Sequence, residues 1–513
     1  MAEYLVGSDV GTGGTKSVVV DKEGNVLGSH FIEYPLETPR PGWAEHDPEI
    51  YWKAVSVTIG QSIAQAGINN KDIRGVSISA LSPACILVDK NLKPLQKAHI
   101  WMDRRATAEC KWLKENIGED RIFEISGNPT DPYYAVAKLM WEKNNRPDLY
   151  KKTYKVQTAA CYPRMKLTGK AVIDYSNASL MGICFDIRKK KWDEKLAAEI
   201  GIDLEKLPDV YPCPEVIGEV TSQAAKETGL APGTPVVAGT VDANAGWLAM
   251  GMVEDGDNSV TMGTAGCLGV CHEKPEFTKN MITIVHTANC EKTYTTLLAL
   301  VSCGALIRYF RDNLGQLEMD TASRLGISEY DVLNLEAEKA PPGSDGLIVL
   351  PYFMGERTPI WDPLARGVLF GLSLAHSRGH IIRALMEGAG YGMLHNLEMI
   401  RKSGLFIKPV LTMGEGGAHS RLWRQIISNI LNVKGAYMAE CPGAPLGNAI
   451  NAGVGVGVYQ NYDVAREWIK FSDRIEPNQD LNEKYMKLYK IYLNLYPAIK
   501  DSFQELALAT GYL

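Results

Sequence analysis

A glycine-rich turn between two short apolar segments occurs near the start of the chain and again near its middle. The first copy reads YLVGSDVGTGGTKSVVV over residues 4–20, and the second reads NSVTMGTAGCLGVC over residues 258–271. The flanking segments are rich in β-branched residues, which predicts two strands joined by a tight turn. Glycine permits such a turn and lets backbone N–H groups approach an anion. Two units of this design predict two lobes of related topology and exclude a short-period repeat protein.

Strand-like and helix-like segments alternate along the rest of the chain, which predicts stacked α/β layers. Asp47 and Pro48 are residue types preferred at the N-cap and at the first position of a helix. The segment 73–89 predicts two strands around a proline, and a glycine cluster within 413–431 leads into an amphipathic helix. We expect the tail, 463–513, to be helical and to pack through a tyrosine-rich face.

Composition excludes several classes of protein. The 513 residues carry a net charge of −6, which argues against a protein that binds nucleic acid through a general basic field. The N-terminus has no basic segment followed by an apolar one, and no window approaches the roughly 18 apolar residues of a membrane span. The ten cysteines are scattered without a CxxC pair, as in a reducing compartment. We therefore expect a cytoplasmic protein without nucleic-acid or membrane partners.

The first glycine-rich turn has the composition of a phosphate-binding loop. It offers backbone, hydroxyl and ammonium donors from Gly11, Thr12, Gly13, Gly14, Thr15 and Lys16. Asp9, at the end of the preceding strand, is placed to hold Mg²⁺, usually through water. The turn matches neither the Walker A pattern nor GxGxxG, and an ordinary hairpin turn remains the alternative.

The second turn repeats this chemistry without the acid, through Gly263 and Thr264. Two such turns are expected to hold one triphosphate from both sides. A third cluster precedes a helix and comprises Gly416, Gly417, Ala418 and Ser420. Its small residues would let a flat base or ribose approach closely, and a tight packing loop is the alternative.

Asp242 stands at the carboxyl end of an apolar strand, where ligands of open α/β sheets bind. The small residues that follow it leave room for a substrate. A carboxylate in this place can accept the proton of a hydroxyl that attacks phosphorus. The alternative is that Asp242 is a helix N-cap.

These residues stand among motifs that resemble the FGGY carbohydrate kinase family, within the actin/hexokinase/Hsp70 fold superfamily. The similarity spans about residues 4–470, and its further motifs, in family order, are PGWAEHDP (41–48), WMDRR (101–105), KLMW (138–141), DYSNA (174–178), GERTP (355–359), RGVLFGL (366–372) and GGAHS (416–420). The resemblance implies a two-lobed, ribonuclease H-like α/β fold with a central cleft. It implies an N-terminal lobe over 1–250 on the sugar side and a C-terminal lobe with a helical tail over 251–513 on the nucleotide side.

The resemblance also implies ATP- and Mg²⁺-dependent phosphorylation of a sugar or polyol hydroxyl, and it suggests a homodimer. In that scheme Asp242 is the catalytic base and Asp9 lies on the metal side. Thr12, Thr15 and Lys16 fall on the first phosphate loop, and Gly263 and Thr264 on the second. Gly304 and the cluster 416–420 fall on the nucleoside side.

Substrate choice is where the sequence departs from its relatives. Leu81, Ser82 and Pro83 stand where xylulose kinases carry Gly-Gln-Met-His-Gly and glycerol kinases carry Asn-Gln-Arg-Glu-Thr. The remaining substrate contacts we expect are Trp43, Trp101, Asp103, Asn244 and Asp242 itself. Two alternatives stay open: Trp43 packs its own loop, and Asp103 pairs with Arg104 or Arg105. We expect an open-chain acceptor, with pentuloses ahead of other ketoses and sugar alcohols. A non-catalytic nucleotide-binding protein of the same superfamily is the remaining alternative.

Three departures concern the nucleotide side. Glu415 stands where the family often has Gly, His419 where it often has Lys, and Ala265 where it often has Ser. We expect only modest effects on nucleotide affinity. His376 and His380 are four residues apart, and we read them as solvated residues at a helix start.

Overall fold

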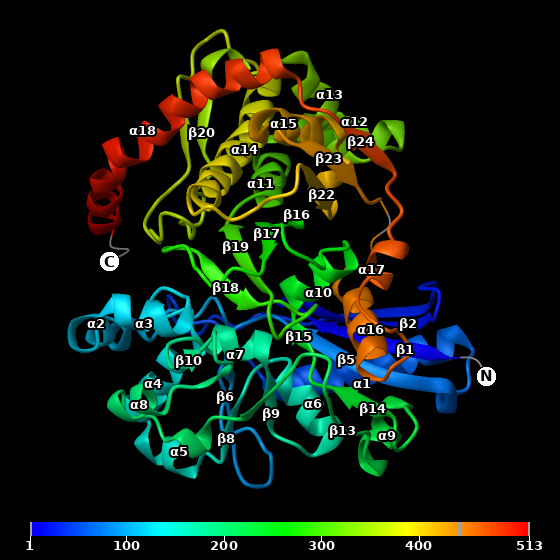
Figure 1. The fold of residues 1–513 in the computed structure, drawn as a ribbon. Helices are drawn as coiled ribbons and strands as arrows, with labels where there is room; N and C mark the ends of the chain where they lie inside the picture. The colour runs from blue at the N-terminus through cyan, green and yellow to red at the C-terminus, as the bar shows by residue number, and fades with distance from the viewer. Residues whose placement is uncertain (1–2, 440, 442, 511–513) are drawn as a thin grey trace. The chain divides into compact units, whose positions relative to one another are not determined.

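The computed structural model describes residues 3–439, 441 and 443–510. The chain forms two compact units, each assembled from segments that are separated in sequence (Figure 1). The first unit comprises Met1–Asp255, Cys271–Thr296 and Pro442–Ile469, and the second comprises Gly256–Val270, Leu297–Cys441 and Lys470–Leu513.

The first unit is built on a sheet with strand order β13-β14-β5-β1-β2-β3, with β15 also paired to β5. Its strands are β1 (Tyr4–Val10), β2 (Gly14–Asp21), β3 (Val26–Glu33), β5 (Ile73–Ala80), β13 (Val216–Glu219), β14 (Pro235–Val237) and β15 (Thr240–Val241). β1 and β2 form the predicted pair of strands, β3 extends them to an antiparallel meander, and β1, β14 and β15 run parallel to β5.

Helix α1 (Pro48–Ala66) covers one face of this sheet by packing on β2 and β3. Asp47 is its N-cap, as predicted, and its side chain accepts the N–H of the second helical residue at 3.0 Å. The helix and sheet approach closely: a Cβ on Gly28 would lie 2.1 Å from the carbonyl oxygen of Ser62. Gly28 pairs with Val19, so the side chain of Val19 points toward α1.

Helix α16 (Ala444–Gly455) covers the opposite face, beside β1, β2 and β5 (Figure 1). A Cβ on Gly7 would lie 1.8 Å from the carbonyl oxygen of Pro445, so only glycine fits between β1 and this helix. Gly7 pairs with Val18. Because Val18 and Val19 are consecutive in a strand, they face opposite sides of the sheet, which places α16 and α1 on its two faces.

The other elements of the first unit surround this core. They are β4 (Glu45–His46), η1 (Asn70–Asp72), β6 (Ile86–Val88), β7 (Ala98–His99), α2 (Thr107–Asn116), α3 (Glu119–Ser126), α4 (Ala135–Asn145), α5 (Pro147–Lys152), β8 (Lys155–Gln157), α6 (Cys161–Thr168), β9 (Val172–Asp174), α7 (Tyr175–Met181), β10 (Phe185–Asp186), β11 (Lys191–Trp192), α8 (Glu194–Glu199), η2 (Leu204–Lys206), β12 (Asp209–Tyr211), α9 (Ser222–Thr228), α10 (Asp242–Ala249), β18 (Ile282–Val285) and α17 (Val464–Glu467). β5 and β6 confirm the two strands predicted around a proline in 73–89.

The second unit contains a sheet with the strand order β19-β17-β16-β22-β23-β24. Its strands are β16 (Asn258–Met262), β17 (Gly266–His272), β19 (Tyr294–Leu300), β22 (Val410–Gly414), β23 (Lys434–Tyr437) and β24 (Asp473–Ile475). β16 and β17 form the predicted hairpin, and β16 runs parallel to β22. Strand β24 corrects the expectation of a wholly helical tail, because it pairs with β23 before the last helix begins.

The remaining elements of this unit are α11 (Gly304–Leu314), α12 (Gln316–Leu325), α13 (Glu329–Lys339), η3 (Ser344–Gly346), β20 (Ile348–Leu350), β21 (Val368–Phe370), α14 (Arg378–Lys402), η4 (Gly416–His419), α15 (Arg421–Leu431) and α18 (Gln479–Ala509). Helix α18 buries Tyr485, Tyr489 and Tyr492, whose rings contact Tyr391 of α14, so the tyrosine-rich face is packed as predicted. His380 completes the capping box of α14, which agrees with its reading as a helix-start residue.

None of the helices in the described part of the chain is both long and apolar enough to span a bilayer.

Candidate active site

Three parallel strands of the first unit end side by side at one edge of its sheet. Asp9 on β1 and Thr240 on β15 both pair with Ser79 on β5. The residues that follow these strands are the glycine-rich turn after β1, Leu81 after β5, and Asp242 after β15. The topology therefore gathers three of the predicted site segments at the carboxyl edge of the sheet, where α/β folds bind their ligands.

Asp9 is a half-buried carboxylate at this edge. The hydroxyl of Ser79 donates a hydrogen bond to its Oδ1 at 2.6 Å, and Asn448 of α16 donates to the Ser79 hydroxyl at 2.6 Å. Burial raises the pKa of Asp9 to about 6, and the bond from Ser79 opposes that rise. A carboxylate oxygen is the donor type that Mg²⁺ prefers, and a bound cation would favour the ionised form. The residue thus fits the predicted metal-side role.

The turn between β1 and β2 is closed by the N–H of Gly11, which donates to the carbonyl oxygen of Gly14 at 2.8 Å. Tyr34 stabilises this turn, because its hydroxyl donates a hydrogen bond to the Gly11 carbonyl oxygen at 2.7 Å. Thr15 is fully buried, and its hydroxyl lies 3.2 Å from that of Tyr34. The buried Thr15 hydroxyl therefore contributes to the stability of the turn.

Thr12 and Lys16 lie on the same turn in different environments. Trp101 donates its indole N–H to the hydroxyl of Thr12 at 3.0 Å, which ties the WMDRR segment to the predicted phosphate loop. Lys16 pairs directly with Asp9 across β1 and β2. Directly paired residues project from the same face of a sheet, so the ammonium and the carboxylate share one side.

Asp242 is the first residue of α10, and Val241 takes the N-cap position. The N-cap alternative for Asp242 is therefore not what the structure shows. Its Oδ1 accepts the N–H of Ala243 at 2.8 Å. An anion in the first turn of a helix is stabilised by the positive end of the helix dipole.

Asn244, two residues after Asp242 on α10, is fully buried. Its Nδ2 donates to the hydroxyl of Ser176 at 3.2 Å and to the carbonyl oxygen of Val285 at 2.9 Å. Its Oδ1 accepts no hydrogen bond from the described residues. Asn244 thus anchors the start of α10 and keeps one acceptor that no protein group satisfies.

The segment that departs from known sugar kinases is tightly held. Leu81 is buried, and its N–H donates to the carbonyl oxygen of Val10 at 2.7 Å. The Ser82 hydroxyl donates to Oδ1 of Asn177 at 3.3 Å. The backbone carbonyl oxygen of Ser82 accepts a hydrogen bond from the Tyr133 hydroxyl at 2.9 Å. This segment therefore presents little unsatisfied polarity to a substrate.

Trp43 and Asp103 form a buried cluster with Arg105. Asp103 is fully buried and accepts hydrogen bonds from Nε and a terminal nitrogen of Arg105 at 2.8 and 2.7 Å, and from the N–H of Ala44 at 2.8 Å. Arg105 also bonds Glu45 at 2.6 Å, and its guanidinium lies 3.7 Å from the centre of the Trp43 ring. The pairing alternative stated for Asp103 is thus the one the geometry supports, and the loop of Trp43 is fixed by Arg105.

The second unit contains a cavity of about 640 Å³. The residues predicted for the nucleotide side in this unit line it, with the exception of Ala418, which is buried. Its lining also includes residues that the sequence reasoning missed, among them Arg308, Tyr330, Asn334, Met386 and Trp423.

One end of this cavity is formed by the turn between β16 and β17. Gly304 donates its N–H to the carbonyl oxygen of Gly263 at 2.8 Å, and a Cβ on Gly304 would lie 2.5 Å from that oxygen. Gly304 begins α11, so the turn is held against a helix N-terminus, a favourable place for an anion. Arg308 adds a cation, because it donates to the hydroxyl of Thr264 at 3.1 Å. This end suits phosphate groups.

The other end suits a flat, polar ring. Ser420 is the N-cap of α15, and its hydroxyl donates to Oδ1 of Asn334 at 2.8 Å. This bond fixes the Asn334 amide with its NH₂ group as a donor. Met386 and the ring of Trp423 contribute apolar surface to the same cavity. An amide donor beside apolar walls matches the edge and faces of a nucleobase.

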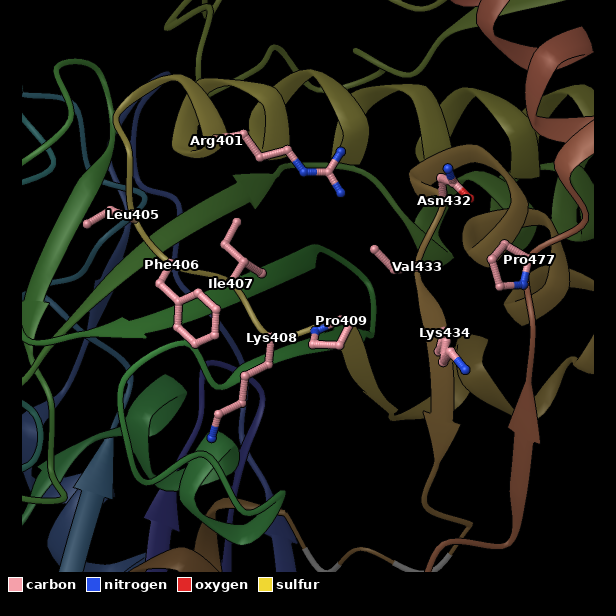
Figure 2. Close-up of a pocket in the computed structure, with 10 residues that line it drawn as sticks. All are labelled: Arg401, Leu405, Phe406, Ile407, Lys408, Pro409, Asn432, Val433, Lys434 and Pro477. Atoms are coloured by element: carbon pink, nitrogen blue, oxygen red, sulfur yellow. The ribbon is translucent and has the colours of Figure 1, made fainter.

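A second hollow, of about 510 Å³, contains none of the predicted residues (Figure 2). Two of its lysines form ion pairs, Lys408 with Asp257 at 2.7 Å and Lys434 with Glu476 at 3.0 Å. A third cation, Arg401, donates to the carbonyl oxygen of Leu431 at 3.3 Å. We assign no chemical role to this second hollow.

Two family models together match most of the chain. The model of the N-terminal domain of the FGGY family of carbohydrate kinases matches residues 4–249, and that of the C-terminal domain matches residues 258–456. The chain is 31% identical to a gluconokinase of Bacillus subtilis, over 99% of this chain and 98% of the relative, and 28% identical to a xylulose kinase of the same organism, over 97% and 98%.

Crystal structures of a xylulose kinase and of a gluconate kinase, both from Lactobacillus acidophilus, superpose with a TM-score of 0.90 at 25% identity. The xylulose kinase alignment covers 98% of this chain and the gluconate kinase alignment 99%, and each covers 100% of the crystal structure's chain. These matches confirm the predicted two-lobed, actin/hexokinase-like α/β fold class.

Proposed function

Because the chain belongs to the FGGY family of carbohydrate kinases, we propose that it transfers the γ-phosphoryl group of ATP to a hydroxyl of an open-chain ketose, with a pentulose as the favoured acceptor. The family is one of phosphotransferases with hydroxyl acceptors. The observation that carries the proposal for this chain is the shared sheet edge that brings Asp9, the glycine-rich turn and Asp242 together.

In this proposal the cavity of the second unit holds ATP. The backbone of Gly263 and Thr264 and the guanidinium of Arg308 bind the phosphates, while Asn334 and Trp423 hold the base. Asp9 would hold Mg²⁺, and the cation would supply charge neutralisation on the phosphate oxygens.

Asp242 is the proposed general base. As the acceptor oxygen forms its bond to the γ-phosphorus, its proton passes to the Asp242 carboxylate, and the bond from that phosphorus to the bridging oxygen of ADP breaks. The helix position of Asp242 and its bond to the Ala243 N–H fix the carboxylate before substrate binds.

A neutral acceptor is favoured by the ion pairs of three arginines in the first unit. Each of three is paired with a carboxylate: Arg104 with Asp131, Arg105 with Asp103, and Arg164 with Asp174. A substrate carboxylate would have to compete with these ion pairs, whereas a ketose needs only hydrogen bonds.

Gluconate is the second candidate acceptor. It is favoured by the 31% identity to a gluconokinase over nearly the whole chain. An aldonate shares the polyol chain of a ketose but adds a negative charge, so a cationic partner in this site would be needed.

Both acceptors can be tested by measuring ADP production against pentuloses, hexuloses, gluconate, tetritols, glycerol and aldoses. We expect one pentulose to stimulate ADP release most strongly. We expect Asp242→Asn to lower kcat by about 10³-fold while the Kd for ADP stays unchanged. Stimulation by gluconate alone would replace the pentulose assignment. Nucleotide binding without stimulation by any acceptor would favour the non-catalytic alternative.

A further inference from the structure

Glu415 has a backbone conformation that is nearly reserved for glycine. Its φ is 70° and its ψ is −175°, and it lies between β22 and η4 in the second unit. Side chains with a Cβ are strained in this region, and such strain concentrates at ligand-binding sites. A glycine would remove the strain, so a glutamate here calls for an explanation in terms of its side chain.

The Glu415 carboxylate lies at the phosphate end of the cavity. The pairing of Thr261 with Gly414 brings the ends of β16 and β22 together, and Oε2 of Glu415 would be 2.5 Å from a Cβ on Gly263. Its negative charge also raises the pKa of the buried Cys303 thiol, although burial is the larger cause. Glu415 itself lines the cavity. These observations place an anionic group against the turn that we propose binds phosphates.

The same turn carries a cation on another element, because Arg308 donates to the Thr264 hydroxyl at 3.1 Å. Arg308 attracts any phosphate chain, whereas Glu415 repels it in proportion to its net negative charge. A divalent cation on the phosphates reduces that repulsion and leaves the other contacts unchanged. The pair therefore makes the cavity sensitive to the charge state of the nucleotide.

We infer that Glu415 is a specificity-determining residue that makes this site discriminate against a bare polyphosphate and in favour of one neutralised by a divalent cation. The inference rests on the proposed function, because it assumes that the cavity binds ATP. It goes beyond that function by assigning the selection of the metal-complexed nucleotide to one carboxylate.

The test is calorimetric titration of the full-length protein with β,γ-imido-ATP, in EDTA and in excess Mg²⁺. The variants are Glu415→Gln, which removes the charge but keeps the side-chain size, and Glu505→Gln on the exposed surface of α18, which makes the same change in net charge. Adenosine serves as a ligand without phosphates, and its Kd is expected to be the same for every variant.

We expect Glu415→Gln to tighten binding of the metal-free analogue by about tenfold to hundredfold, and binding of the Mg²⁺ complex, which carries about half the net negative charge, by only about threefold to tenfold. Glu505→Gln should change neither. Equal effects on both forms, or no effect on either, would overturn the inference while leaving the proposed function standing. Failure of the wild-type protein to bind the Mg²⁺ complex would overturn the proposed function, and the inference with it.

Discussion

Replacing Asp9 with Asn is expected to stabilise the first unit at neutral pH and to abolish the proposed activity. The carboxylate is half-buried at the end of β1, and burial raises its pKa from 3.8 to about 6. The charged form is therefore less favourable in the folded chain than in the unfolded one. Asn keeps the oxygen that accepts the Ser79 hydroxyl but carries no charge.

The magnitude follows from the shift of about two pKa units. At about 1.4 kcal/mol per unit this is close to 3 kcal/mol, which we reduce to about 1–2 kcal/mol because the group is partly exposed and screened by solvent. The sign is set by proton binding, because between pH 4 and 6 the folded chain binds the Asp9 proton more tightly than the unfolded chain does. The wild-type free energy of unfolding thus falls as pH rises through this window and is level above it.

Thermal unfolding in EDTA between pH 4 and 8 checks this reasoning. We expect Asp9→Asn to melt about 2–3 °C above the wild type at pH 8, with the difference shrinking toward zero near pH 4. Asp148→Asn, at an exposed position on α5, is the control and should show no such pH dependence. A variant that melts at or below the wild-type temperature at pH 8, or a difference independent of pH, would refute the argument.

Two further substitutions test other parts of the site. Arg105→Met leaves the carboxylates of Asp103 and Glu45 buried without their cation, so urea unfolding should show a loss of about 3–5 kcal/mol, and an unchanged midpoint would contradict the role of Arg105. Gly304→Ala places a methyl group against the carbonyl oxygen of Gly263, and calorimetry should show the Kd for ADP rising by about tenfold or more. Retention of wild-type affinity would show that the turn can shift without cost.

Local patterns predicted the parts of the fold that depend on neighbouring residues. The β1–β3 meander, the N-cap of α1 and the β16–β17 hairpin each follow from glycine, proline or acidic residues a few positions apart. Strand β24 has only three residues, too few for periodicity, and it exists because Ile475 pairs with Gly435 of β23. The packing of α16 on β1 joins residues at the two ends of the sequence and leaves no local signal.

The site shows the same contrast. Asp9, Asp242 and the glycines could be predicted because strand ends and turns are visible in the sequence. Arg308 was missed, although it lies four residues after Gly304 and hence on the same helix face. The conformation of Glu415 was beyond sequence reasoning, since a positive φ at a charged residue is set by the surrounding backbone.

The packing of α16 against β1 also has a consequence for the way this chain is made. Strand β1 leaves the ribosome long before the helix that covers one of its faces, which lies at residues 444–455. At a translation rate of about 5–20 residues per second, that face of the sheet stays uncovered for roughly 20–90 s. Throughout this interval the nascent sheet exposes apolar surface that the finished protein buries. The first unit therefore cannot be completed until residues 444–455 have been synthesised, and we expect yield in a cell to depend on chaperone capacity and elongation rate more than on the stability of the folded enzyme.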